Sequence, residues 1–350
     1  MTITKTEKFE KIFNKFTSSK KINEGILLIE NISGEFSFMK RYGEKNLNSP
    51  LLMASITKLF TTSCILILLE QNKISLEDRI LKYFDTNILK GVHIYNGRDY
   101  SLELTISDLL FQTSGLPDVY LEGENSLIDR IIQEDFYINF YDTISEVKKL
   151  KPHFEPKKKG KAYYADINFD ILGQIVEKES GLTLFKAYEK YIFEPLELAN
   201  TYLPGDKHDE IPKIYYMNQV IHRPKFVISS GASGGCITTA QELMIFIKAF
   251  FGGKLFDKSI FSRLSIYNKL QASMGPIHYG GGYMQISLSG PISLFMGKGE
   301  LIGHSGSTGS FAFYYPIKDL FFVGDINQMA DASLPIRLSI QLAMAANRIF

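Results

Sequence analysis

The sequence predicts a mixed α/β fold of the α+β type, in which one antiparallel sheet is assembled from both ends of the chain. Short alternating or apolar runs, typical of strands, lie near the N-terminus and again in the last quarter of the chain. The central part carries helical patterns separated by polar loops. We therefore expect a mostly helical region inserted into a sheet domain, with the site in the cleft between them.

The first quarter of the chain contains a predicted amphipathic helix, two strands and a long apolar helix. Ile12, Phe13 and Phe16 share one face of the first helix. The tetrapeptide Asn31-Ile32-Ser33-Gly34 separates the two strands and is typical of a hairpin turn. In chain order these elements cover residues 7–19, 25–30, 35–42 and 56–72.

The remaining elements follow the same logic. Helical patterns in the central part cover residues 106–110, 125–133, 169–179 and 185–191. The last part holds two helices that flank four strands, with the helices at 240–252 and 333–348 and the strands at 282–288, 292–296, 311–315 and 320–325. These patterns predict a sheet domain of residues 1–54 plus 230–350 and a mostly helical domain of residues 55–229.

Composition limits the classes of function. The chain has 350 residues, 45% of them hydrophobic, which suits one large domain or two interleaved ones. Lys plus Arg number 39 against 38 Asp plus Glu, so the net charge gives no case for binding nucleic acid or an anionic membrane. No run is long enough for a membrane span, and no apolar signal segment follows the first charged residues. We expect a cytoplasmic protein, unless an export signal was trimmed away.

Metal and cofactor sites are not predicted. Cys64 and Cys236 are too few for a disulfide framework or a structural zinc site, and we expect two free thiols. The histidines show no metal-ligand spacing. The expected partner is a small-molecule or short-peptide substrate, and the oligomeric state stays open.

The candidate nucleophile is Ser55. It begins a Ser-x-x-Lys motif that ends at Lys58 and lies at the start of the long apolar helix. Three residues make nearly one helical turn, so the hydroxyl and the amine share a face. A lysine in a dry cleft can lose its proton near neutral pH and then accept the serine proton. The alternative is a helix-capping serine beside a lysine whose stem lies along the surface.

Context distinguishes this motif from three others of the same pattern. Ser18 lies in a lysine-rich amphipathic stretch, Ser37 in an alternating run and Ser145 in a polar helical stretch. Only Ser55 begins a segment apolar enough to be buried, and burial can lower the pKa of a lysine.

Two further motifs supply polar groups. Tyr164-x-Asp166 precedes a helix: Tyr164 can donate or accept a proton, and Asp166 can fix Lys58 or accept a hydrogen bond from a substrate amide. Its alternative is a half-buried aromatic followed by a helix cap. Near the C-terminus, Gly303-His304-Ser305-Gly306-Ser307 offers small residues that a substrate backbone can approach. We expect His304 to take part in proton transfer or to orient the substrate. The alternative for this motif is a glycine-rich turn before a strand.

In this order and at these separations, the three motifs resemble those of the serine β-lactamase and penicillin-binding protein superfamily. The similarity is greatest to the branch of class C β-lactamases, D-alanyl-D-alanine carboxypeptidases and esterases. It extends over roughly residues 22–348 and includes connecting blocks at residues 74–84, 106–118, 172–181 and 232–240. The resemblance implies a β-lactamase/transpeptidase-like fold.

The resemblance also implies a role for each matching residue. Ser55 would be the acylated nucleophile, Lys58 its activator and Tyr164 the group that shares the proton relay and protonates the leaving group. The backbone N–H groups of Ser55 and Ser307 would form an oxyanion hole. The expected substrate-binding residues are Gln112, Asp166, Ser305 and Gly306, and His304 joins the catalytic set.

Two departures from the family pattern bear on the substrate. Asp166 replaces the usual Asn, and a carboxylate there would favour a charged Lys58 and shift work to Tyr164. His304 replaces the usual Lys and would attract a substrate carboxylate only when protonated. The His304 departure weakens the case for a β-lactamase or strict carboxypeptidase and favours neutral esters or amides.

The resemblance therefore implies a serine hydrolase that cleaves an ester or a D-amino-acid peptide or amide through a Ser55 acyl-enzyme. One alternative is a β-lactamase or penicillin-sensitive D-alanyl-D-alanine carboxypeptidase. The lack of an export signal counts against it, because cell-wall cross-links lie outside the membrane. The other alternative is a non-catalytic, penicillin-binding-like sensor module. The joint presence of Ser55, Lys58 and Tyr164 counts against that one.

Overall fold

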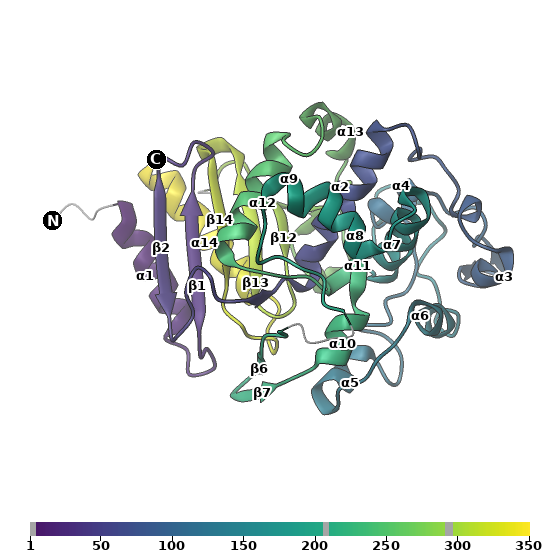
Figure 1. Ribbon diagram of the computed structural model, residues 1–350, viewed down its shortest axis with the longest axis horizontal. Coiled ribbons are helices and arrows are strands. Elements are labelled where there is room, and N and C mark those ends of the chain that lie inside the picture. Colours follow the sequence, from purple (N-terminus) through teal and green to yellow (C-terminus); the bar gives the residue numbers. More distant parts are fainter. Residues whose placement is uncertain (1–4, 206–209, 291–296) are drawn as a thin grey trace.

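The computed structural model describes residues 5–205, 210–290 and 297–350 of the chain. In Figure 1 a large sheet with its helices occupies one side and a group of helices occupies the other. Within the described residues the sheet has eight strands, all antiparallel, in the order β2-β1-β14-β13-β12-β11-β10-β9. The two N-terminal strands thus join six strands from the last quarter of the chain. This arrangement confirms the predicted α+β fold with one sheet built from both ends.

The strands of this sheet vary in length. They are β1 (Gly25–Glu30), β2 (Ser37–Tyr42), β9 (Asn268–Lys269), β10 (Ile277–Tyr279), β11 (Met284–Ser287), β12 (Glu300–Ser305), β13 (Ser310–Tyr315) and β14 (Leu320–Asp325). Three small two-stranded sheets pair β3 (Leu51–Leu52) with β8 (Ile237–Thr238), β4 (Ile94–Tyr95) with β5 (Arg98–Asp99), and β6 (Ile214–Tyr216) with β7 (Gln219–Ile221).

Helices cover the sheet and form the other half of the molecule. Those packed on the sheet are α1 (Lys5–Thr17), α12 (Ala240–Gly252) and α14 (Leu334–Ile349). The others are α2 (Thr57–Glu70), α3 (Thr86–Leu89), α4 (Ile106–Leu110), α5 (Leu127–Gln133), α6 (Phe140–Val147), α7 (Ile167–Ser180), α8 (Leu184–Tyr188), α9 (Glu194–Leu196), α10 (Pro224–Ser229), α11 (Gly231–Gly234) and α13 (Phe261–Leu264).

Helix α2 lies inside the molecule and carries the site. Its residues from Thr57 to Leu68 are all buried, because its sequence is apolar on every face and only enclosure satisfies such a helix. It packs against α7, α8 and α11. Helix α2, which begins two residues after Ser55, is therefore held by neighbours on several sides, and this holds the candidate nucleophile in place.

The sequence-based elements agree with most of this fold and miss part of it. The strand predicted at 292–296 lies outside the described residues. Strand β12 was not among the predicted strands, because Gly303 interrupts the apolar pattern that marks a strand. Cys64 and Cys236 are both free, as expected. The two-domain division at residues 54 and 230 stays a prediction.

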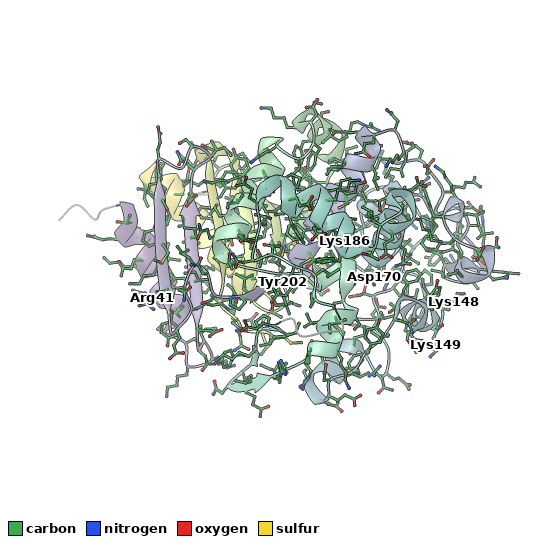
Figure 2. The ribbon with its side chains drawn as sticks, in the orientation of Figure 1. Arg41, Lys148, Lys149, Asp170, Lys186 and Tyr202 are labelled. Atoms are coloured by element: carbon green, nitrogen blue, oxygen red, sulfur yellow. The ribbon has the colours of Figure 1, made fainter. Side chains whose placement is uncertain are left out.

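The basic side chains do not gather into one stripe. Lys148 and Lys149 lie at the outer edge of the helical side, whereas Arg41 lies on β2 at the opposite end of the molecule (Figure 2). Among the described helices, none is both long and apolar enough to cross a membrane.

Candidate active site

Ser55 lies in a short 3-10 helix, Ala54–Ile56, that leads directly into α2. Ala54 has a φ of 45°, in the left-handed region that costs a non-glycine residue roughly 1–2 kcal/mol. The segment is held in place from outside, since Met53 N donates to Cys236 O at 2.9 Å. Backbone strain of this kind persists where the surrounding structure enforces it, and here it determines the direction of the Ser55 side chain.

Lys58 is fully buried and directs its ammonium group at three oxygens. The distances from Nζ are 3.1 Å to Ser55 Oγ, 2.7 Å to Ser233 O and 2.6 Å to Asp166 Oδ1. The Ser-x-x-Lys spacing thus brings the hydroxyl and the nitrogen into contact, one helical turn apart. Through these contacts Lys58, near the start of α2, is linked to Ser233 in α11 and to Asp166 just before α7.

Tyr164 faces the same serine. Its side chain is buried, and its hydroxyl has no hydrogen-bond partner of good geometry among the described residues. Burial, and then the charge of Asp166, raise the pKa of Tyr164 well above its usual range, while the hydroxyl of Ser55 acts in the opposite direction. The Lys58 Nζ lies 5.1 Å from the centre of the phenol ring. The phenol is therefore protonated at neutral pH and close to both groups.

Gln112 contacts the backbone on both sides of Tyr164 and lines neither of the two cavities described below. Its side chain is fully buried, and Oε1 accepts from Ala165 N at 3.0 Å. Its carbonyl accepts from Tyr163 N at 2.9 Å. The family resemblance suggested Gln112 as a substrate-binding residue; in the structure its carbonyl oxygens satisfy buried backbone N–H groups, and a contact with substrate stays a prediction.

His304 also lies beneath the site instead of facing it. It is fully buried on β12, with Nδ1 2.8 Å from Ser305 O and Nε2 3.3 Å from Tyr279 Oη. Burial, and then the nearby charge of Lys58, lower the pKa of His304 to about 3. The imidazole is neutral at physiological pH and lines neither cavity, so it carries no charge that could attract a substrate carboxylate. Its ring packs near Tyr164 instead, with centroids 6.0 Å apart.

The turn between β12 and β13 closes over the nucleophile. A Cβ on Gly306 would lie 2.2 Å from Ser310 Oγ and 2.5 Å from Met53 O, so only glycine permits this approach. Within the described residues, the backbone N–H groups of Ser55 and Ser307 donate no hydrogen bond. Two free donors beside a nucleophile are what a developing oxyanion requires.

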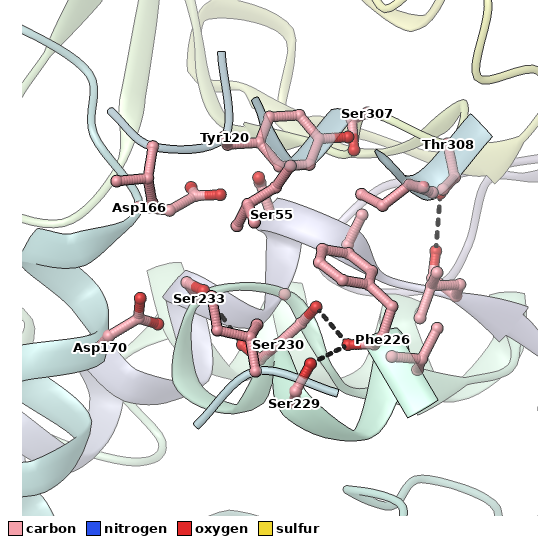
Figure 3. A pocket seen from close by; sticks show the side chains of 18 of the residues that line it. Ser55, Tyr120, Asp166, Asp170, Phe226, Ser229, Ser230, Ser233, Ser307 and Thr308 are labelled. Atoms are coloured by element: carbon pink, nitrogen blue, oxygen red, sulfur yellow. Dashed lines mark hydrogen bonds between the residues drawn. The ribbon is translucent and has the colours of Figure 1, made fainter. Parts of the chain in front are cut away.

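Two cavities meet at Ser55. The small cavity, about 70 Å³, has one apolar part, formed by side chains such as Ile131, Ile214 and Phe226, and one polar part, which includes Asp166, Asp170, Ser229, Ser230 and Ser233. The large cavity, about 370 Å³, is lined among others by Leu121, Tyr164, Met274, Ile277, Ser305, Gly306 and Ile336. Ser55, Tyr120, Asp166 and Ser307 line both cavities. Figure 3 shows the Tyr120 ring beside Ser55, with its hydroxyl next to Ser307.

Two carboxyl groups near Lys58 were not among the predicted site residues. Asp118 lines the large cavity, and its Oδ1 accepts from Asp166 N at 3.2 Å. Burial, and then the charge of Asp166, raise the pKa of Asp118 well above its usual value. Asp170 lines the small cavity one helical turn beyond Asp166 (Figure 3). The sequence feature that could have identified Asp170 is its i, i+4 spacing from Asp166, because residues at this spacing share a helix face.

Asp170 makes stability depend on pH. Burial, and then the charge of Asp166, raise the pKa of Asp170 to about 7, so the folded protein keeps a proton that the unfolded chain releases near pH 4. Stability therefore falls as the pH rises from about 4 to about 7. We expect Asp170→Asn to raise the Tm by about 2 °C or more at pH 8 and to leave it nearly unchanged at pH 4. Differential scanning calorimetry at both pH values checks this, with the exposed Asp85→Asn as control. An equal shift at both pH values would contradict it.

Comparisons with known proteins identify the family of the chain. The family model described as Beta-lactamase matches residues 39–343. Protein flp of Staphylococcus aureus (strain MRSA252) is 27% identical over 247 residues, which make up 64% of this chain and 44% of that protein. The chain thus spans less than half the length of this relative. A putative D-alanyl-D-alanine carboxypeptidase of Escherichia coli (strain K12) is 23% identical over 302 residues, 77% of this chain and 67% of that one.

The fold also matches solved structures. The crystal structure of a D-stereospecific amidohydrolase from Streptomyces sp. superposes with a TM-score of 0.76. It covers 95% of this chain and 97% of that one at 22% sequence identity. At this identity the likeness establishes the shared fold.

Proposed function

Because the chain belongs to the Beta-lactamase family of serine hydrolases, we propose that it cleaves an ester or a D-amino-acid peptide or amide through an acyl-enzyme on Ser55. One observation carries the proposal: Lys58 Nζ lies 3.1 Å from Ser55 Oγ at the meeting point of two cavities. A hydroxyl in contact with a buried amine, and open to substrate, is the arrangement that nucleophilic catalysis by serine needs.

Acylation begins with proton transfer from Ser55 to Lys58. The ion pair between Lys58 and Asp166, 2.6 Å long, is the resting arrangement. When substrate excludes water, the ammonium passes a proton to the carboxylate and leaves a neutral amine facing Ser55. The amine accepts the Ser55 proton while Oγ forms a bond to the substrate carbonyl carbon. The N–H groups of Ser55 and Ser307 stabilise the resulting oxyanion.

Tyr164 then protonates the leaving group. Its raised pKa keeps the phenol protonated in the resting site, which suits a proton donor and not a resting base. As the bond from the carbonyl carbon to the leaving oxygen or nitrogen breaks, the leaving atom takes the Tyr164 proton. Lys58 then donates a proton to Tyr164. Water next attacks the acyl-enzyme ester and gives a proton to the pair of Lys58 and Tyr164. The pair returns a proton to Ser55 Oγ as the bond from Oγ to the carbonyl carbon breaks.

The charges around the site support a substrate without a carboxylate. Among the described residues that line the two cavities, the only Lys or Arg is Arg337, and it pairs with Asp331 at 2.8 Å. Lys58 is occupied by Asp166, and His304 is neutral. The acidic side chains that line the two cavities are instead those of Asp118, Asp166 and Asp170. This balance disfavours the β-lactamase and carboxypeptidase alternative, since those substrates carry a carboxylate.

A substrate panel tests the proposal. Intact-protein mass and turnover are measured with p-nitrophenyl acetate, D-alanine p-nitroanilide, a D-Ala-D-Ala peptide and a chromogenic cephalosporin. We expect turnover of the ester or of the amide, and a slower reaction or none with the two carboxylate substrates. Faster turnover of the cephalosporin than of every other compound would favour a β-lactamase. Absence of both turnover and any covalent adduct with every compound would favour the non-catalytic sensor module.

A further inference from the structure

The inference concerns how a substrate lies across Ser55, and it rests on the proposed function. Tyr164 lines the large cavity and not the small one. A group that protonates the leaving atom must lie on the leaving-group side of the carbonyl carbon. The leaving group therefore occupies the large cavity, and the acyl group points into the small one.

The small cavity admits only a compact acyl group. Its volume of about 70 Å³ has room for about five water-sized groups. Its far wall comes from α5, β6 and α10, through Ile131, Ile214 and Phe226, and these side chains belong to an apolar cluster that is separate from the main core. Burying a short apolar acyl group against these side chains is favourable until the space is filled.

Tyr120 separates the two cavities. It lines both, and Figure 3 shows its ring beside Ser55. Its hydroxyl lies next to Ser307 (Figure 3). Its N–H donates to Asp118 Oδ1 at 3.3 Å, and its carbonyl accepts from Ile128 N at 3.1 Å. These two bonds fix the backbone of Tyr120 where its ring lies beside Ser55.

We propose that Tyr120 is the specificity-determining residue of this hydrolase. By closing the small cavity beside Ser55, it restricts the enzyme to esters or amides with a compact apolar acyl group and a larger apolar leaving group.

The test compares acyl groups of increasing length with a constant leaving group. Values of kcat/KM are measured for p-nitrophenyl acetate, butyrate and octanoate. Wild-type protein should prefer the two short esters. Tyr120→Ala should raise the octanoate-to-acetate ratio by about tenfold or more, because it joins the cavities. Tyr120→Phe keeps the ring and should hold the ratio within about twofold of wild type. Tyr120→Leu provides a second shortened variant should the alanine protein fold poorly.

A second series changes only the leaving group. Phenyl acetate and naphthyl acetate should keep the same relative kcat/KM in wild type and in Tyr120→Ala, since the large cavity already holds both. The exposed Tyr137→Ala should change neither ratio. Equal octanoate and acetate values in wild type, or a Tyr120→Ala effect on the leaving-group series alone, would overturn the role of Tyr120 while leaving the hydrolase intact. Absence of Ser55-dependent turnover of any ester or amide would overturn the proposed function and this inference together.

Discussion

Ser55→Ala is expected to lose all measurable turnover and all covalent adduct. Ser55 is the only hydroxyl in contact with Lys58 Nζ among the described residues, and no other serine combines such a contact with a place between the two cavities. Without Oγ the acyl-enzyme cannot form, and the remaining oxyanion donors can act only on bound water. The measurements are initial rates with the best substrate from the panel and intact-protein mass after incubation with a slow ester.

The chain supplies its own control for this variant. Ser145 begins another Ser-x-x-Lys pattern, but it lies exposed on α6 and donates to Tyr141 O at 2.9 Å. Ser145→Ala should therefore keep wild-type rates and the wild-type adduct. If Ser55→Ala were to retain activity above a few per cent, or to carry the acyl mass, the nucleophile would have to be sought elsewhere.

Lys58→Met is expected to lower kcat by roughly 10³-fold or more, since a nucleophile and its base act as a unit. Methionine keeps most of the buried stem but removes the nitrogen that contacts Ser55, Ser233 and Asp166. The Asp166 carboxylate is then left without its partner, which also destabilises the fold. The double variant Lys58→Met with Asp166→Asn removes that second effect. Its Tm should recover toward wild type while kcat stays low.

The matched control is Lys148→Met, the lysine of the Ser145 pattern, which lies at the outer edge of the molecule (Figure 2). It should leave kcat and Tm unchanged. A loss of only a few-fold in Lys58→Met, with the fold intact, would mean that Tyr164 activates Ser55 without the amine. In that case the fall in kcat at low pH would be set by the pKa of the Tyr164 phenol.

Local patterns determined much of this architecture. The hairpin of β1 and β2, the buried helix α2 and the terminal helix α14 each follow from a periodicity that the chain carries within 10–20 residues. The serine and lysine meet for the same reason: their contact depends only on one turn of helix. Motif order was sufficient to predict the fold class, which the antiparallel sheet and the family match confirm.

The surroundings of each motif residue depended on tertiary packing. His304 and Gln112 were expected beside the substrate, yet both are fully buried, because chain segments distant in sequence close over them. His304 loses its charge through burial and the nearby Lys58, a cause that no local pattern contains. Asp118 and Tyr120 reach the site only because the segment after α4 folds against the segment before α7.

The sequence alone determined the fold class, through its strand and helix patterns and the order of its motifs. It also determined the contact between Ser55 and Lys58, which depends on one turn of helix. Only the tertiary structure decided which side chains face the substrate and which stay charged. Exposure and electrostatic environment arise from contacts between residues such as Lys58 and Asp166, which lie far apart along the chain. The division of the site into two cavities by Tyr120 is likewise a product of that packing.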